Sequence, residues 1–304
     1  MTAQLPFVPL TLGPAEAVDA LAAVLVDGLD VEAAPARSNI PVPAGELLLM
    51  PAASARFTGV KIAGVVPGNA ARGLPRITGS YLLLDGPTLQ PLALLDGVAL
   101  TSLRTPAVTA LALRQLAEPD ASHLVLFGTG PQAFAHLDAL LAIRPLTRVT
   151  VVGRSPEPAA ALVAYAASLG LAAALGTPEA VAEADLVVCC TTAREPLFDG
   201  ARVPGHAAVA AVGSHEPVAR EVDSALVERS ALYVESRAVA LREAGDLLIP
   251  SVPGDRLANL SELVNGKAVV PTDRPRFFKS VGMAWEDLAV ASAQFTAADP
   301  KQFR

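Results

Sequence analysis

The chain has 304 residues and a formal net charge of -7 at pH 7. Its lysines and arginines form no cluster, which excludes the basic surface that nucleic-acid binding needs to displace counterions. No basic amphipathic helix for a membrane surface is evident either. Hydrophobic residues make up 52% of the chain, enough for a sizeable core, and the length suggests about two domains.

The mean hydropathy of +0.44 raises the question of a membrane span. The most apolar window, 158–175, is interrupted by Ser168 and Gly170, so we expect a buried helix followed by a short strand. No signal-peptide pattern opens the sequence, and a cytoplasmic location is expected. The adjacent Cys189 and Cys190 are interpreted as buried strand residues. No metal motif is visible.

The first hundred residues predict an antiparallel or mixed sheet in a domain of its own. Apolar runs there alternate with turn signals such as Pro67-Gly68-Asn69 and Asp85-Gly86-Pro87. The expected strands are 47–50, 60–66, 80–84 and 92–95. A helix over 100–116 follows, and a final helix over 280–294 is expected to return to this domain.

From Ala121 onward strands alternate with helices, a pattern typical of a doubly wound parallel sheet. The expected strands are 123–127, 148–152, 185–190, 207–212 and 232–235, with helices reaching about 143 and spanning 157–169. The sequence therefore predicts an α/β fold with two domains. A Rossmann domain covers 119–279, and a smaller α+β domain combines 1–118 with 280–304.

The turn after the first of these parallel strands predicts a dinucleotide site. It reads Gly128-Thr129-Gly130-Pro131-Gln132-Ala133. Small residues allow the tight turn, the approach of the backbone to a pyrophosphate, and close packing of helix on strand. The N-terminus of the following helix then offers free N–H groups to phosphate. The flanking strands support this interpretation over a turn that binds nothing.

The end of the second parallel strand bears on the choice of cofactor. NAD sites place an acidic residue there for the ribose hydroxyls, whereas NADP sites supply arginine. Here the sequence is Gly153-Arg154-Ser155. Arg154 can pair with the extra phosphate and Ser155 can donate a hydrogen bond, so we predict NADPH, with NADH also possible. The alternative is that Arg154 is a solvated surface residue.

Several segments resemble the ornithine cyclodeaminase/mu-crystallin family, in that family's order and over nearly the whole chain. They are 48–52 (LLMPA), 59–61 (GVK), 67–75 (PGNAARGLP), 94–97 (LLDG), 100–105 (LTSLRT), the turn at 128–133, 213–215 (GSH), 220–223 (REVD) and 279–282 (KSVG). Residues 66–85 look most like the branch that reduces cyclic ketimines. The resemblance implies a homodimer whose N-terminal domain supplies the subunit interface and the floor of the substrate site.

The resemblance places Arg37, Lys61 and Arg104 at the positions that bind the substrate carboxylate. The sequence itself favours a function for two of them. Lys61 interrupts the apolar strand pattern GVKIAGVV, and Arg104 interrupts the start of an otherwise uncharged helix. A buried charge is costly without a partner, so an anionic ligand is expected there. Arg37 lies in a Pro-rich loop, where either interpretation holds.

Asp223 matches the family's catalytic aspartate, and the resemblance also makes Lys61 a catalytic candidate. A carboxylate near a protonated imine can stabilise its positive charge and manage its proton. Glu221 is the local competitor for this role. The alternative is that Asp223 caps the helix that follows, a task that could coexist with catalysis.

Further cofactor contacts are expected where strands end, because ligands of open α/β sheets bind at the carboxyl edge. These candidates are Thr191, Thr192, Gly213, Ser214, Ser280, Val281 and Gly282. The last three are expected to close the nicotinamide pocket. His215 is a weaker candidate for a general acid.

The resulting hypothesis is an NADPH-dependent reductase that acts on a cyclic ketimine carboxylate. The substrate would be Δ1-pyrroline-2-carboxylate or Δ1-piperideine-2-carboxylate, and the product L-proline or L-pipecolate. The alternatives are an ornithine cyclodeaminase or amino-acid dehydrogenase of the same family, or a protein that binds NADPH and a small ligand without turnover. The sequence does not distinguish the ring size.

Overall fold

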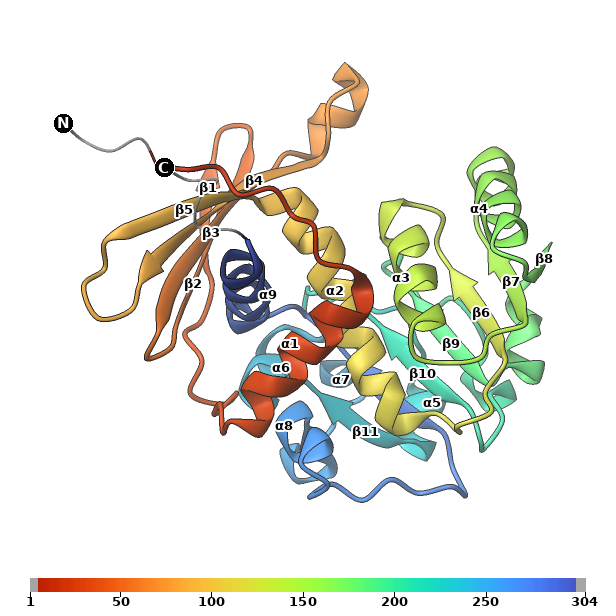
Figure 1. Cartoon of the computed structure of the whole chain (residues 1–304). Coiled ribbons are helices and arrows are strands. Elements are labelled where there is room, and N and C mark those ends of the chain that lie inside the picture. Colours follow the sequence, from red (N-terminus) through yellow and green to blue (C-terminus); the bar gives the residue numbers. More distant parts are fainter. Residues whose placement is uncertain (1–4, 299–304) are drawn as a thin grey trace. The chain divides into compact units, whose positions relative to one another are not determined.

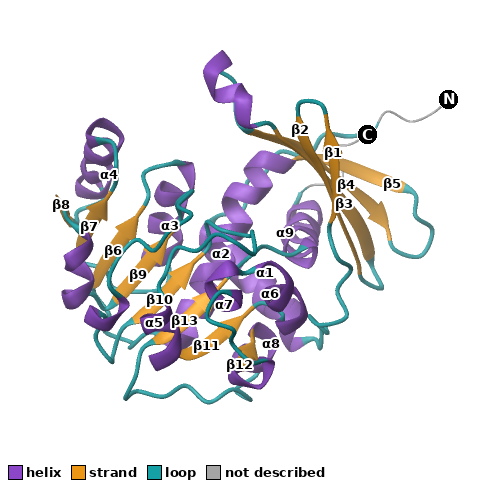
Figure 2. Ribbon diagram, turned by 180° about the vertical axis from the view of Figure 1, so that it is seen from behind, coloured by secondary structure: helices purple, strands orange, loops and turns teal. Residues whose placement is uncertain are grey.

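The computed structural model describes residues 5–298, and the chain divides into two compact units (Figures 1 and 2). Unit 1 contains Met1–Val24, Ala33–Arg104 and Met283–Arg304, of which 1–4 and 299–304 lie outside the described residues. Unit 2 contains Leu25–Glu32 and Thr105–Gly282.

The boundaries predicted at 118/119 and 279/280 differ from those of the two units. Residues 105–118 and 280–282 belong to unit 2. The cause lies in helix α2 (Gly97–Leu116), which continues from one unit into the other without a break. Its second half makes contacts within unit 2, such as the 3.0 Å hydrogen bond between Thr109 and His136.

Unit 1 contains a five-stranded antiparallel sheet in the order β1-β2-β3-β4-β5. The strands are β1 (Ser38–Val42), β2 (Gly45–Ala53), β3 (Phe57–Val65), β4 (Ile77–Asp85) and β5 (Pro91–Asp96). The predicted antiparallel sheet is confirmed, with longer strands than expected. Strand β1 was not predicted, because it has only two apolar residues, Ile40 and Val42, and a proline between them.

The buried face of this sheet carries helix α9 (Ala284–Ala297), drawn in dark blue beside β2 and β3 in Figure 1. Helix α2 begins three residues earlier than predicted, since Asp96 accepts hydrogen bonds from the backbone N–H groups of Val98 and Ala99. The remaining helices of the N-terminal segments are α1 (Pro14–Val26) and the short η1 (Pro67–Arg72).

Unit 2 contains an eight-stranded sheet in which every pair of neighbours is parallel, in the order β12-β11-β13-β10-β9-β6-β7-β8 (Figure 2). Its strands are β6 (His123–Phe127), β7 (Arg148–Val152), β8 (Ala172–Leu175), β9 (Leu186–Cys189), β10 (Ala208–Ala211), β11 (Ala231–Val234), β12 (Leu257–Asn259) and β13 (Arg276–Lys279). The predicted Rossmann-type sheet is confirmed. Strands β12 and β13 were not predicted.

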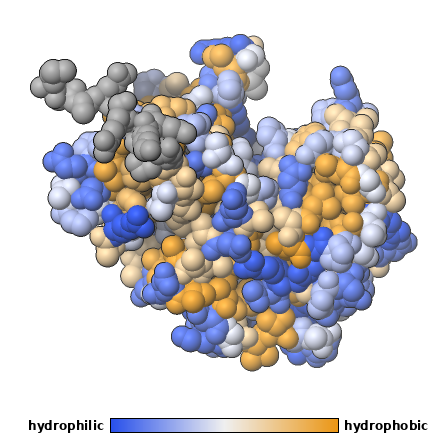
Figure 3. Space-filling view, viewed as in Figure 1, coloured by the Kyte–Doolittle hydropathy of each residue, from blue (hydrophilic) through white to orange (hydrophobic). Residues whose placement is uncertain are grey.

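The longer helices of unit 2 are α3 (Pro131–Leu141) and α4 (Pro156–Ser168); the short ones are α5 (Ser224–Arg229), α6 (Arg237–Glu243), α7 (Gly245–Leu248) and α8 (Leu260–Val264). The apolar window 158–175 forms α4 and β8, as expected. Among the described helices none is long and apolar enough to cross a membrane. Figure 3 shows hydrophilic and hydrophobic residues interspersed on the face it displays.

Strand β6 lies at the point where the chain reverses direction across the sheet. From β6 the chain proceeds outward through β7 and β8, then returns to β9 on the other side of β6. Open α/β sheets bind ligands beyond the carboxyl ends of the strands at such a point. The turn at Gly128 leaves β6 there, and Cys190 follows β9, so the fold places both next to the expected cofactor site.

Both cysteines are free thiols; Cys189 ends β9 and is buried, as predicted, whereas Cys190 follows the strand and is only partly buried. Burial raises the pKa of both, and nearby Glu221 raises them further. A thiol kept protonated in this way is a poor nucleophile, so neither cysteine is a candidate for chemistry.

Candidate functional site

The glycine-rich turn after β6 has the backbone that a dinucleotide site requires. Gly128 has φ +112°, and a Cβ atom there would lie 2.6 Å from the carbonyl oxygen of Cys190. Gly130 precedes the first residue of α3 and has no side chain capping the helix. Nothing lies within 4 Å of a Cβ built on Gly130, so its approach is open.

Two further observations fit a bound dinucleotide at this turn. A Cβ on Gly153 would lie 2.5 Å from Cγ2 of Thr129, so the turn packs directly against the end of β7. The side-chain oxygen of Gln132 is buried and accepts no hydrogen bond from any described residue. A buried acceptor without a donor is costly, and a ligand that donates a hydrogen bond would satisfy it.

The end of β7 carries no acidic side chain. Arg154 and Ser155 are both exposed, and among the described residues nothing pairs with the Arg154 guanidinium. Ser155 precedes α4 without capping it through its hydroxyl group. Both side chains are therefore available for a ligand at the position expected for the ribose of the cofactor.

A buried carboxylate joins the ends of β9 and β10. Glu221 accepts hydrogen bonds from the Thr191 backbone N–H (2.8 Å), the Thr191 hydroxyl (2.7 Å) and the Gly213 N–H (2.7 Å). Burial raises the pKa of Glu221, while Lys279 and these donors oppose the shift. Thr191 and Gly213 were predicted to contact the cofactor, and the structure shows that their polar groups bind Glu221. Thr192 follows them and is exposed.

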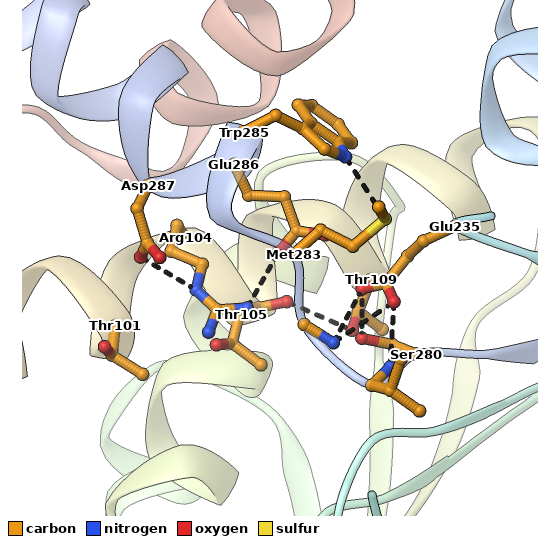
Figure 4. A network of polar contacts seen from close by, with 12 residues as sticks. Thr101, Arg104, Thr105, Thr109, Glu235, Ser280, Met283, Trp285, Glu286 and Asp287 are labelled. Atoms are coloured by element: carbon orange, nitrogen blue, oxygen red, sulfur yellow. Dashed lines mark hydrogen bonds and ion pairs between the residues drawn. The ribbon is translucent and has the colours of Figure 1, made fainter. Parts of the chain in front are cut away.

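A second buried carboxylate holds the segment after β13. Glu235, which follows β11, accepts hydrogen bonds from the Ser280 hydroxyl (2.6 Å) and the Val281 N–H (2.8 Å), and both its oxygens accept from the Gly282 N–H (3.1 Å each) (Figure 4). Residues 280–282 were predicted to close the nicotinamide pocket. Their conformation is held by Glu235, which was not among the predicted site residues. Ser214, also predicted, donates to the Ala219 carbonyl (2.9 Å).

Asp223 is the N-cap of α5. One oxygen accepts from the Leu226 N–H and the other from the Gly200 N–H, both at 2.9 Å. The helix-cap interpretation of Asp223 is thus confirmed. Its catalytic role stays a prediction, because a capping carboxylate that is partly exposed can also face a ligand.

Unit 1 brings Lys61 and Arg104 together around one carboxylate of helix α9. Asp287 contacts the Lys61 ammonium at 2.7 Å and 2.9 Å. It also contacts the Arg104 Nε at 3.2 Å, and Glu286 binds Arg104 at 2.7 Å (Figure 4). Thr101 accepts from Lys61 at 3.2 Å. All four charged side chains are buried. Burial lowers the pKa of Lys61 to about 8, and the Asp287 charge limits that shift.

The acids of this cluster were missed by the sequence reading. Glu286 and Asp287 are the only charged residues of α9. Like Lys61 in its strand, they interrupt an apolar pattern, and this signal could have identified them. Arg37, the third predicted cation, precedes β1 and is half-buried. His215 follows β10 and is exposed.

Comparison with known proteins gives the context for this geometry. The model of the ornithine cyclodeaminase/mu-crystallin family matches residues 18–299. The chain belongs to this family. Delta(1)-pyrroline-2-carboxylate reductase 2 of Burkholderia ambifaria is 36% identical over 88% of the chain and 86% of its own length. A Delta(1)-pyrroline-2-carboxylate/Delta(1)-piperideine-2-carboxylate reductase of Azospirillum brasilense is 37% identical over 84% and 82%.

Among solved structures, the Delta(1)-pyrroline-2-carboxylate reductase of Thermococcus litoralis in complex with NADH and L-proline has a TM-score of 0.88. It is 29% identical, and the match covers 95% of the chain and 97% of that structure. This member of the ornithine cyclodeaminase/mu-crystallin family is therefore an oxidoreductase that uses a nicotinamide cofactor.

The substitution Gly128→Ala tests the cofactor turn. A side chain there is strained by the positive φ and collides with the Cys190 carbonyl, so we expect nicotinamide affinity to fall at least tenfold. Isothermal titration with NADPH and NADH measures it. The control is Gly170→Ala, at φ +86° with nothing within 4 Å, which costs about 1–2 kcal/mol of folding free energy and leaves cofactor affinity unchanged. Equal affinities in both variants would contradict the assignment.

Proposed function

We propose that the chain catalyses the NADPH-dependent reduction of Δ1-pyrroline-2-carboxylate or Δ1-piperideine-2-carboxylate to L-proline or L-pipecolate. The observation that carries this proposal is the similarity, over more than four fifths of the chain, to reductases named for these two imines. The solved relative with bound L-proline and NADH supports the same substrate class. The homodimer and the cytoplasmic location stay predictions.

The reaction adds one hydride to the imine carbon and one proton to the nitrogen. The reduced nicotinamide supplies the hydride when it is bound. In unit 1, Lys61 and Arg104 would bind the substrate carboxylate together with Arg37, because buried cations are suited to a desolvated anion. Lys61 and Asp223 are the candidates for holding the proton and stabilising the positive iminium. Fixing the imine carbon toward the hydride is the main contribution expected of the protein.

In unit 2, the turn Gly128–Ala133 would hold the pyrophosphate with the N-terminus of α3. The extra phosphate of NADPH would pair with Arg154 and Ser155. Thr191, Thr192, Gly213 and Ser214 would border the nicotinamide, and Ser280–Gly282 would close its pocket. The backbone N–H groups of Thr191 and Gly213 already donate to Glu221, so the cofactor would contact other atoms of these two residues.

Purified protein should oxidise NADPH when either cyclic imine is added. It should form one molecule of L-proline or L-pipecolate for each NADPH consumed. Absorbance at the nicotinamide band and chromatography of the product measure this. The ratio of rates with the two imines gives the ring preference. NADPH binding without oxidation on either imine would contradict the proposal. Release of ammonia from L-ornithine with catalytic NAD would instead favour a cyclodeaminase, and oxidation of another amino acid would favour a dehydrogenase.

Arg154→Ala should lower kcat/KM for NADPH by about tenfold or more, with little effect on NADH. A charge-assisted hydrogen bond to phosphate contributes about 1.5–3 kcal/mol, and NADH has no phosphate at this position. The control is Arg148→Ala, which removes a half-exposed arginine from the start of β7, the strand that Arg154 follows. Comparable efficiency of the unmodified protein with NADH and NADPH would overturn the preference.

The affinity for the imine carboxylate should fall as the pH rises through about 8. The pKa of Lys61 is lowered from 10.5 to about 8, so its ammonium group is progressively lost as the pH rises through about 8. The value of kcat/KM for the imine is therefore expected to fall about tenfold per pH unit on the alkaline side. Lys61→Arg is the control, because arginine keeps its charge and should remove this limb. An unchanged alkaline limb in Lys61→Arg would assign the titration to another group.

A further inference from the structure

Two buried acids of unit 2 differ from the others in forming no ion pair, although the charge of Lys279 also acts on Glu221. Five acidic residues are buried among those that the structure describes: Glu221, Glu235, Asp246, Glu286 and Asp287. Asp287 pairs with Lys61 and Arg104, and Glu286 pairs with Arg104. Asp246 pairs with Lys279, both fully buried, at 3.0 Å. Of these five buried acids, Glu221 and Glu235 are the two that form no ion pair with a described residue.

Every hydrogen-bond partner of Glu235 is a donor. Its oxygens accept from the Ser280 hydroxyl and from the N–H groups of Val281 and Gly282, and the residue is 1% exposed. An ionised carboxylate, which can only accept, satisfies every one of these donors. Glu221 has the same arrangement around Thr191 and Gly213, with 0% exposure.

The negative charge is not needed for the hydrogen bonds of Glu235. In a glutamine, the side-chain oxygen could accept from Val281 and Gly282, and the amide NH2 could donate to the Ser280 hydroxyl, whose proton can rotate away. Burying an ion without a counter-ion costs several kcal/mol, whereas a neutral amide would cost less. The position therefore has a charge that stability alone does not explain.

Both carboxylates bind the segments proposed to border the nicotinamide. Glu221 holds residues 191 and 213 after β9 and β10, and Glu235 holds 280–282 after β13. With Asp246 and Lys279 included, the buried groups at this edge are three acids and one base. The excess is negative, and burial already disfavours the anion of Glu221 by raising its pKa. A positive group bound at this edge would relieve that excess.

We propose that Glu221 and Glu235 are positioning residues whose charge stabilises the oxidised, positively charged nicotinamide ring. Departure of the hydride with its two electrons leaves one positive charge on the ring, so fixed negative charge nearby favours hydride donation to the imine. This inference rests on the nicotinamide site of the proposed function, and does not depend on which imine or amino acid is the substrate.

Glu235→Gln is the deciding variant, and the measurement is the dissociation constant of NADP+ and of NADPH without any imine present. The ratio Kd(NADP+)/Kd(NADPH) should rise about five- to fiftyfold, because only the oxidised ring loses an attraction. The temperature of unfolding without cofactor should stay close to that of the unmodified protein or rise. Glu221→Gln should shift the ratio in the same direction, which keeps the proposal testable if one variant folds poorly.

Glu32→Gln is the matched control. Glu32 also accepts several hydrogen bonds from one segment, from Ser236, Arg237 and Ala238, but it is half-exposed and pairs with Arg237. This variant should lose stability without changing the cofactor ratio. Equal weakening of NADP+ and NADPH in Glu235→Gln would overturn the electrostatic role and leave a structural one. A shifted ratio in a protein that reduces neither imine would uphold this inference while the proposed substrate fails.

Discussion

Burial of charge is the constraint on which both units depend. A charged group taken out of water is tolerated only where opposite charges or hydrogen-bond donors and acceptors surround it. In unit 1, the Asp287 carboxylate is the opposite charge for both Lys61 and Arg104. Lys61 and Asp287 are 226 positions apart in the sequence. The ion pairs therefore hold the last helix of the chain on a sheet built from its first hundred residues.

The same constraint shapes the carboxyl edge of the parallel sheet in unit 2. Among the described strands β13 comes last in the sequence, yet it lies between β10 and β11 in the sheet. This insertion carries Lys279 into the core, where Asp246 neutralises it, and sets Ser280 beside Glu235, which follows the adjacent strand β11. Asp246 also accepts hydrogen bonds from the backbone N–H groups of Glu221 and Val222. Asp246 therefore connects the Glu221 carboxylate to Lys279, which precedes the segment held by Glu235. The backbone at this edge is thus held by side-chain oxygens rather than by loops alone.

What the sequence predicted and what it missed follow from the range of the interactions involved. Strands β6 and β7 and the turn at Gly128 are local patterns, and each was predicted within a residue or two. Strand β13 has four residues with a charge at each end, so its place in the sheet depends on partners far along the chain. The charges of Lys61 and Arg104 were noticed because they interrupt apolar patterns. Their acidic partners on α9, and Glu235, become meaningful only when the contacts are known.

The signs of the buried charges suit the two ends of the proposed reaction. In unit 1 the two cations Lys61 and Arg104 are balanced by two acids, and burial keeps the pKa of Lys61 near 8. An arriving carboxylate would favour the ammonium form there, so substrate binding near that pH takes up a proton. In unit 2 the excess at the edge is negative, which a ring that becomes positive would offset. Hydride transfer moves negative charge from cofactor to imine, and the excess of buried acids at the edge of unit 2 has the sign that the cofactor's part in this movement requires.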